Sequence, residues 1–189
     1  MTTPEIILVI AGIVVLVAAG IALWYYLRSQ ALRRKFGPEF DRLASEKDSV
    51  AEAARELRER ERRHAELQLK ELSPESREWY AEQWRELQTR FVQSPEEAVG
   101  QADELVTRLI KECGYPVGQF DEQADLLSVE HAKTIGDYRT AHDIAIRHAK
   151  GEADTEELRQ AVVHYRELVA DLIGQDPVPA RGRRTRRDA

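Results

Sequence analysis

The hydrophobic pattern divides the chain into one continuous apolar segment and a series of amphipathic ones. Residues 6–23 contain no polar side chain, and the aromatic residues Trp24, Tyr25 and Tyr26 follow directly. As a helix, a segment of about 22 residues would rise roughly 33 Å, which matches the hydrocarbon thickness of a bilayer. Aromatic residues at the edge of such a segment are typical of a membrane interface. The pattern therefore predicts a transmembrane anchor over residues 1–27.

Basic residues lie on only one side of this segment. Arg28, Arg33, Arg34 and Lys35 follow it, whereas no Lys or Arg precedes it. Because basic flanks are retained in the cytoplasm, we expect a single-pass cell-membrane protein with its N-terminus outside and its C-terminal domain cytoplasmic. These four residues and the three aromatic ones are the predicted membrane interface. A cleaved signal peptide is the alternative, since residues 20–22 (Gly-Ile-Ala) resemble a cleavage site, but the basic region that should precede it is missing.

Residues 28–72 are predicted to form a basic juxtamembrane segment and a charged helical spacer. Gly37-Pro38 should interrupt the first helix, because proline cannot continue the hydrogen-bond ladder. The following residues to position 72 contain no further Gly or Pro and are rich in strong helix formers. Their apolar stripe is too thin for a packed face, so we expect a solvated helix or a marginal coiled-coil partner. The arginines between positions 58 and 63 alternate with glutamates, which indicates a salt-bridged face rather than a nucleic-acid site.

Residues 73–174 show the pattern of a compact antiparallel helical bundle. Ser73 and Ser94 are each followed by proline and glutamate, which is typical of a helix N-terminus, and Ser94 with Glu97 has the spacing of a capping box. Apolar residues then recur three and four positions apart, as at Tyr80 and Trp84. A short helix is expected after Phe120, and longer ones over residues 131–149 and from Thr155 to Gly174. The predicted fold class is all-α.

The charge distribution separates these segments further. Residues 73–174 contain 21 acidic and 11 basic residues, whereas residues 175–189 have two acidic residues and five arginines. An acidic bundle makes nucleic acid an unlikely partner and favours a basic protein. The tail should be disordered, and it could contact anionic lipid, RNA or an acidic partner, or have no partner. Its arginines are Arg181, Arg183, Arg184, Arg186 and Arg187.

Few residues are candidates for chemistry. His131 and His142 share a helical face with Tyr138, and His164 lies in the next helix, which allows a metal- or ligand-binding hypothesis. The sequence has one cysteine and no HExxH, phosphate-binding loop or nucleophile motif, so we expect no catalytic residue, no metal and no cofactor. Cys113 lies in an apolar stripe and is interpreted as a buried, unreactive thiol.

Several stretches resemble a known bacterial family. They are FGPEFDR (36–42), ERERRHAEL (59–67), LSPESREWYAEQWRELQTRFV (72–92) and TEELRQAVVHYRELV (155–169). The family they resemble is mainly actinobacterial, and consists of small, single-pass, membrane-anchored helical proteins often labelled hypothetical or secreted. The resemblance implies membrane attachment and helices, and it implies no activity. A secreted label conflicts with the orientation that the charges predict.

The leading hypothesis is a non-enzymatic, membrane-tethered cytoplasmic helical module that interacts with other proteins. Trp79 could anchor such a partner if it is exposed. The alternatives are a ligand- or metal-binding bundle that uses the three histidines, and a lipid or RNA contact made by the tail.

Overall fold

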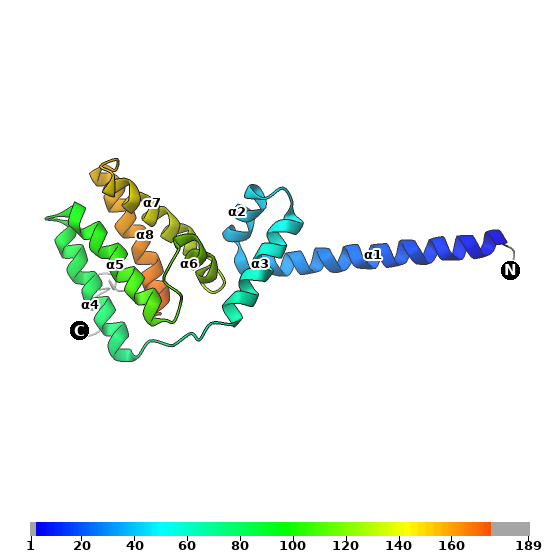
Figure 1. Ribbon diagram of the computed structural model, residues 1–189, viewed down its shortest axis with the longest axis horizontal. Coiled ribbons are helices and arrows are strands. Elements are labelled where there is room, and N and C mark those ends of the chain that lie inside the picture. Colours follow the sequence, from blue (N-terminus) through cyan, green and yellow to red (C-terminus); the bar gives the residue numbers. More distant parts are fainter. Residues whose placement is uncertain (1–2, 175–189) are drawn as a thin grey trace, which may run out of the picture. The chain divides into compact units, whose positions relative to one another are not determined.

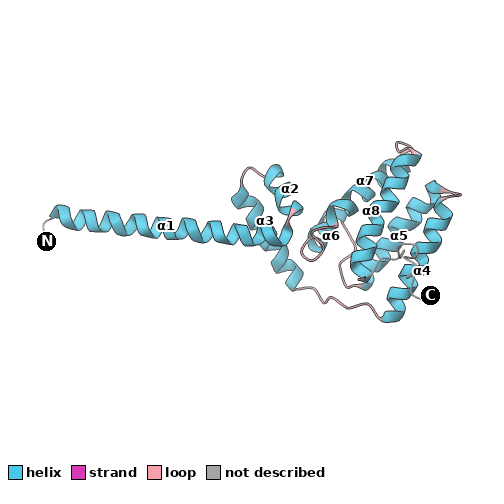
Figure 2. Ribbon diagram, turned by 180° about the vertical axis from the view of Figure 1, so that it is seen from behind, coloured by secondary structure: helices cyan, strands magenta, loops and turns pink. Residues whose placement is uncertain are grey.

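The computed structural model describes residues 3–174, except for the side chains of residues 3–11, 14, 18, 22, 25 and 26. Its helices are α1 (Thr3–Phe36), α2 (Pro38–Glu46), α3 (Val50–Ala65), α4 (Pro74–Phe91), α5 (Pro95–Glu112), α6 (Phe120–Leu127), α7 (Ile135–Ala149) and α8 (Thr155–Ile173) (Figure 1). Within the described range every regular element is a helix (Figure 2), which confirms the all-α prediction. The chain divides into two compact units, residues 1–58 and residues 59–189.

The first unit is built on the long helix α1. This helix continues unbroken through the predicted membrane segment and ends at Phe36, where Gly37 adopts a φ of 48° and Pro38 begins α2. α2 packs against α1, and Arg33 of α1 forms an ion pair of 3.0 Å with Asp41 of α2. Searched over its described residues, the structure offers no helix with both the length and the apolar character needed to cross a bilayer. The membrane anchor therefore stays a prediction.

The predicted solvated spacer is interrupted and partly buried. α2 ends at Glu46 and α3 at Ala65, and the residues from there to α4 are not helical. The apolar side chains of Phe40, Leu43 and Leu57 are buried, so the expectation that this stripe was too thin to pack was wrong. The boundary between the two units falls after residue 58, which places the end of α3 in the second unit.

The arginines at the end of α3 are not equivalent. Arg60 is only 3% exposed, and its guanidinium lies 2.8 Å from the Asp125 carboxylate on α6. Arg62 behaves as the sequence predicts, because its side chain is 67% exposed and pairs with Glu59 one turn earlier. The prediction that all these arginines are solvated was thus wrong for Arg60, whose buried charge is stabilised by Asp125, a residue distant in the sequence.

The second unit contains the helical bundle. α4 and α5 form one antiparallel hairpin, α7 and α8 form another, and α8 packs against α4, α5 and α7 (Figure 2). The predicted stripes face inward: the largest fully buried side chains include Tyr80 and Trp84 of α4, Tyr138 of α7 and Tyr165 of α8. The short helix α6 lies beside α7, as expected from its apolar residues.

The observed helix caps and helix bounds agree in part with those predicted from the sequence. Ser73 caps α4 by accepting a hydrogen bond of 3.1 Å from the Ser76 amide. Ser94 makes no side-chain cap hydrogen bond, so the capping box predicted there was wrong. The capping box lies instead at the start of α8, where Asp154 and Glu157 exchange hydrogen bonds of 2.8 and 2.9 Å. α7 begins at Ile135 rather than at residue 131, because the preceding residues form turns.

The connector between α3 and α4 packs against the turn that follows α5. The Lys70 amide donates a hydrogen bond of 2.9 Å to the Cys113 carbonyl. Gly114 has a φ of 95°, and a Cβ at this position would lie 2.6 Å from the carbonyl oxygen of Gln68. Glycine is required here both by its backbone conformation and by the close approach of the connector.

Candidate functional site

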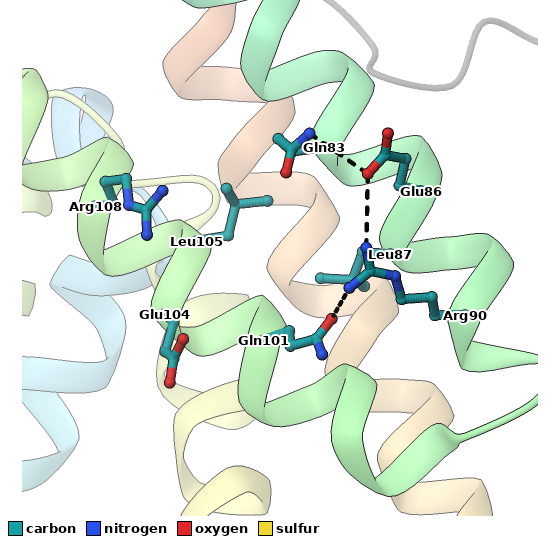
Figure 3. A pocket seen from close by; sticks show the side chains of 8 residues that line it. All are labelled: Gln83, Glu86, Leu87, Arg90, Gln101, Glu104, Leu105 and Arg108. Atoms are coloured by element: carbon teal, nitrogen blue, oxygen red, sulfur yellow. Dashed lines mark hydrogen bonds and ion pairs between the residues drawn. The ribbon is translucent and has the colours of Figure 1, made fainter.

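α4 and α5 carry the same sequence pattern on the face where they lie side by side. Residues 83–90 read QWRELQTR and residues 101–108 read QADELVTR, so Gln, Glu, Leu, Thr and Arg recur at identical spacing. Positions three, four and seven residues apart share one helical face. The Gln, Glu, Leu and Arg of both copies therefore line one groove between the two helices (Figure 3). Its lining residues are Gln83, Glu86, Leu87, Arg90, Gln101, Glu104, Leu105 and Arg108.

The groove has an apolar floor and charged walls. Leu87 and Leu105 are buried beneath it, and the cavity volume is about 180 Å³. Arg90 reaches across from α4 to donate a hydrogen bond of 2.9 Å to the Gln101 side-chain oxygen of α5 (Figure 3). The same guanidinium lies 3.7 Å from the Glu86 carboxylate. The walls can therefore offer both donors and acceptors to a bound molecule.

An exposed aromatic side chain lies beside Arg108, which lines the groove. Trp79 is 42% exposed, and the Arg108 guanidinium lies 5.8 Å from the centre of its ring. This geometry is within the range of a cation–π interaction. The rings of Trp79 and Tyr80 meet edge to face at 4.9 Å, and Tyr80 itself is buried. Trp79 thus has the exposure that a partner anchor requires.

The opposite face of α5 enters a polar network inside the bundle. The Asp103 carboxylate accepts a hydrogen bond of 2.6 Å from the Tyr165 hydroxyl of α8 and lies 3.3 Å from Nδ1 of His142 on α7. Burial acts to raise the pKa of Asp103, but these two contacts outweigh it and leave that pKa below its ordinary value. Burial first, and the neighbouring Asp103 charge second, raise the pKa of the Tyr165 hydroxyl. The Asp103 carboxylate of α5 therefore contacts both α7 and α8.

A second set of contacts surrounds this carboxylate. The His142 ring stacks on Phe120 of α6 with ring centres 3.7 Å apart and an interplanar angle of 9°. The Tyr138 hydroxyl donates to the side-chain oxygen of the buried Gln123, whose amide group donates to the Pro116 carbonyl. These hydrogen bonds satisfy buried polar groups, so we interpret the network as structural.

The candidate metal-ligating histidines are not brought together. His131 Nδ1 lies 2.8 Å from Asp171, and His164 Nδ1 lies 2.7 Å from Asp137, while His142 contacts Asp103. Each histidine thus faces a different carboxylate. Within the described part of the chain, no group of three or more potential ligands has a geometry that could hold a metal ion.

The single cysteine is buried at the end of α5. Burial, with a smaller contribution from the neighbouring Glu112 charge, raises the pKa of the Cys113 thiol to about 11. Since the thiolate is the reactive form, this environment disfavours nucleophilic chemistry.

The predicted membrane-interface residues lie on α1. Trp24 is exposed, and the Arg28 guanidinium lies 4.9 Å from the centre of its ring. Lys35 lies over the Phe36 ring, and Arg34 is exposed. The side chains of Tyr25 and Tyr26 lie outside the described residues. So do all five arginines of the predicted basic tail, from Arg181 to Arg187.

No protein-family model matches this chain, and neither the curated proteins nor the solved structures contain a match. The groove and its repeated pattern must therefore be interpreted from this chain alone. The repeat was visible in the sequence as an 18-residue offset between two stretches of the form Q-x-x-E-L-x-T-R. The repeat matches no known catalytic or metal-binding motif, so motifs alone could not indicate it.

Proposed function

We propose that this protein is a non-enzymatic, membrane-tethered module that presents its helical bundle to a protein partner at the cytoplasmic face. The groove between α4 and α5, bordered by the exposed Trp79, carries the proposal. Tryptophan and arginine are enriched at the energetic centres of protein interfaces, and here the exposed Trp79 lies beside Arg108, one of the two arginines that line the groove. The absence of catalytic motifs from the sequence favours binding over catalysis.

The tether is supported by the sequence of residues 6–27 and by the basic residues that follow it. An uncharged segment of this length fits the hydrocarbon layer, and arginines on one side favour a cytoplasmic C-terminus. Side chains along the described part of α1, such as Val15, Leu16 and Val17, are exposed apolar groups. Such a helix needs an apolar environment to cover it.

Membrane fractionation of the full-length chain tests the tether. We expect the chain to remain in the membrane pellet after alkaline extraction, whereas Leu16→Arg combined with Val17→Arg should release it. A matched control combines Ile146→Arg with Val163→Arg, at two exposed apolar residues of α7 and α8, and should leave the chain in the pellet. A C-terminal reporter that is active in only one compartment tests the orientation. A soluble wild-type chain, or a reporter active only outside, would contradict the proposal.

A further inference from the structure

We propose that the exposed face of α4 and α5 joins two copies of this chain in a symmetric dimer, in which Glu104 of each copy pairs with Arg108 of the other. This inference names the partner of the docking surface described above and rests on the proposed function.

The charge of the groove differs from that of the bundle around it. The groove is lined by two glutamates and two arginines, whereas residues 73–174 as a whole contain 21 acidic and 11 basic residues. Two copies of such an acidic bundle repel each other over most of their surface. Association is favoured only where the contacting faces carry both charges in equal numbers, as this face does.

The two groove charges on α5 have different contacts from the two on α4. Glu104 and Arg108 are exposed and lie one helical turn apart, and among the described residues neither forms an ion pair. The Arg108 guanidinium lies over Trp79 instead. At the equivalent positions of α4, Glu86 and Arg90 lie within 3.7 Å of each other. The α5 copy of the repeat therefore keeps an acidic and a basic group available to a partner.

The charges on α5 are complementary to those of the same helix in a second, symmetry-related copy. In a two-fold dimer, residue i of one copy contacts residue j of the other, and j contacts i in turn. If the two α5 helices cross antiparallel midway between positions 104 and 108, Glu104 meets Arg108 twice. A second copy of the same helix therefore satisfies both charges reciprocally.

The surface around these charges is suited to close helix contact. Gly100 lies one turn before Glu104, is exposed, and has no atom within 4 Å of the position that a Cβ would take. Glycine disfavours a helix interior, and here it leaves room for a second helix to approach. Trp79, beside Arg108, supplies an aromatic group at the edge of the contact. A shared membrane would further raise the effective concentration of the two copies.

Charge reversal in the full-length, detergent-solubilised chain tests the dimer. We expect the wild-type chain to sediment as a dimer at micromolar concentration. Glu104→Arg and Arg108→Glu should each raise the dissociation constant at least about tenfold, because each places like charges opposite each other twice. An equimolar mixture of the two variants should restore a heterodimer, in which every reversed charge meets its opposite. Glu152→Arg makes the same charge change in the exposed turn before α8 and should leave the dimer intact.

Unchanged far-UV circular dichroism and an unchanged midpoint of urea unfolding would show that the variants are folded. For a variant that fails this control, Glu104→Gln or Arg108→Gln replaces it, with a smaller expected loss. A monomeric wild-type chain, a dimer that survives both reversals, or a mixture without rescue would overturn the inference. A chain that pellets with membranes and is monomeric would refute the dimer alone. A dimer that does not pellet would refute the tether alone.

Discussion

Replacing Asp103 with alanine removes the acceptor shared by Tyr165 and His142. The Tyr165 side chain is fully buried, and its hydroxyl would lose its 2.6 Å acceptor, the partly buried Asp103 carboxylate. A hydrogen bond to a charged group contributes about 1.5–3 kcal/mol, and an unpaired buried donor costs a similar amount. We therefore expect Asp103→Ala to lower the free energy of unfolding by about 3 kcal/mol, which corresponds to a melting temperature lower by roughly 10 °C.

A double-mutant cycle isolates the Asp103–Tyr165 contact. Tyr165→Phe removes the donor without leaving an unpaired group, so the double variant should be less destabilised than the sum of the single variants. The expected coupling is about 1.5 kcal/mol. Urea unfolding of the full-length chain, followed by far-UV circular dichroism of its helices, measures all four corners of the cycle. Additivity to within about 0.5 kcal/mol would refute the proposed role of this hydrogen bond.

The same carboxylate gives a pH dependence with a defined sign. The folded protein holds the pKa of Asp103 below its ordinary value of 3.8. A lowered pKa means that the carboxylate stabilises the fold fully above that ordinary value and loses this contribution as the pH falls through the folded pKa. The stability difference between wild type and Asp103→Ala should therefore shrink below about pH 4. A difference that grows on acidification would contradict this assignment.

Two pairs of substitutions and one labelling experiment test other contacts. Gly114→Ala should lower the free energy of unfolding in urea by about 2 kcal/mol or more, because Gly114 has a positive φ and a Cβ there would clash with the Gln68 carbonyl. Gly136→Ala on α7 is the control, since a Cβ there meets no atom within 4 Å, and it should be neutral or slightly stabilising. Arg60→Ala should lower the free energy of unfolding by about 3 kcal/mol, because the partly buried Asp125 carboxylate loses one of its partners. Arg62→Ala removes an exposed side chain and should change the free energy of unfolding by less than about 0.5 kcal/mol. Equal effects would refute the distinction between a buried and an exposed arginine. Cys113 should react slowly with maleimide at pH 8 and rapidly in denaturant, and fast labelling of the native chain would contradict its burial.

Features fixed by nearby residues were the ones that could be predicted. The stripe through Tyr80, Trp84 and Leu87 indicated the buried face of α4, because the helical period alone places these residues together. The cap at Ser73 was likewise visible in the local sequence. Ser94 has the same sequence signal, but its backbone (φ −140°, ψ 76°) places it without a side-chain cap hydrogen bond.

Contacts between distant residues could not be predicted. Arg60 and Arg62 look alike in the sequence, and only the position of Asp125 decides which of them is buried. Asp103 and Tyr165 are 62 residues apart, and no periodicity connects them. The groove falls between these cases, since its residues repeat visibly along the chain, but their convergence depends on α4 and α5 packing antiparallel.

The packing of the connector has a mechanical consequence. If the predicted N-terminal anchor is held while the bundle is pulled, force enters the second unit through the end of α3. Along the chain, it would reach the Arg60–Asp125 ion pair and the Lys70–Cys113 hydrogen bond before it reaches α4. The segment from residue 66 to residue 72 would therefore extend only after these two contacts break, and would not behave as a freely extensible linker.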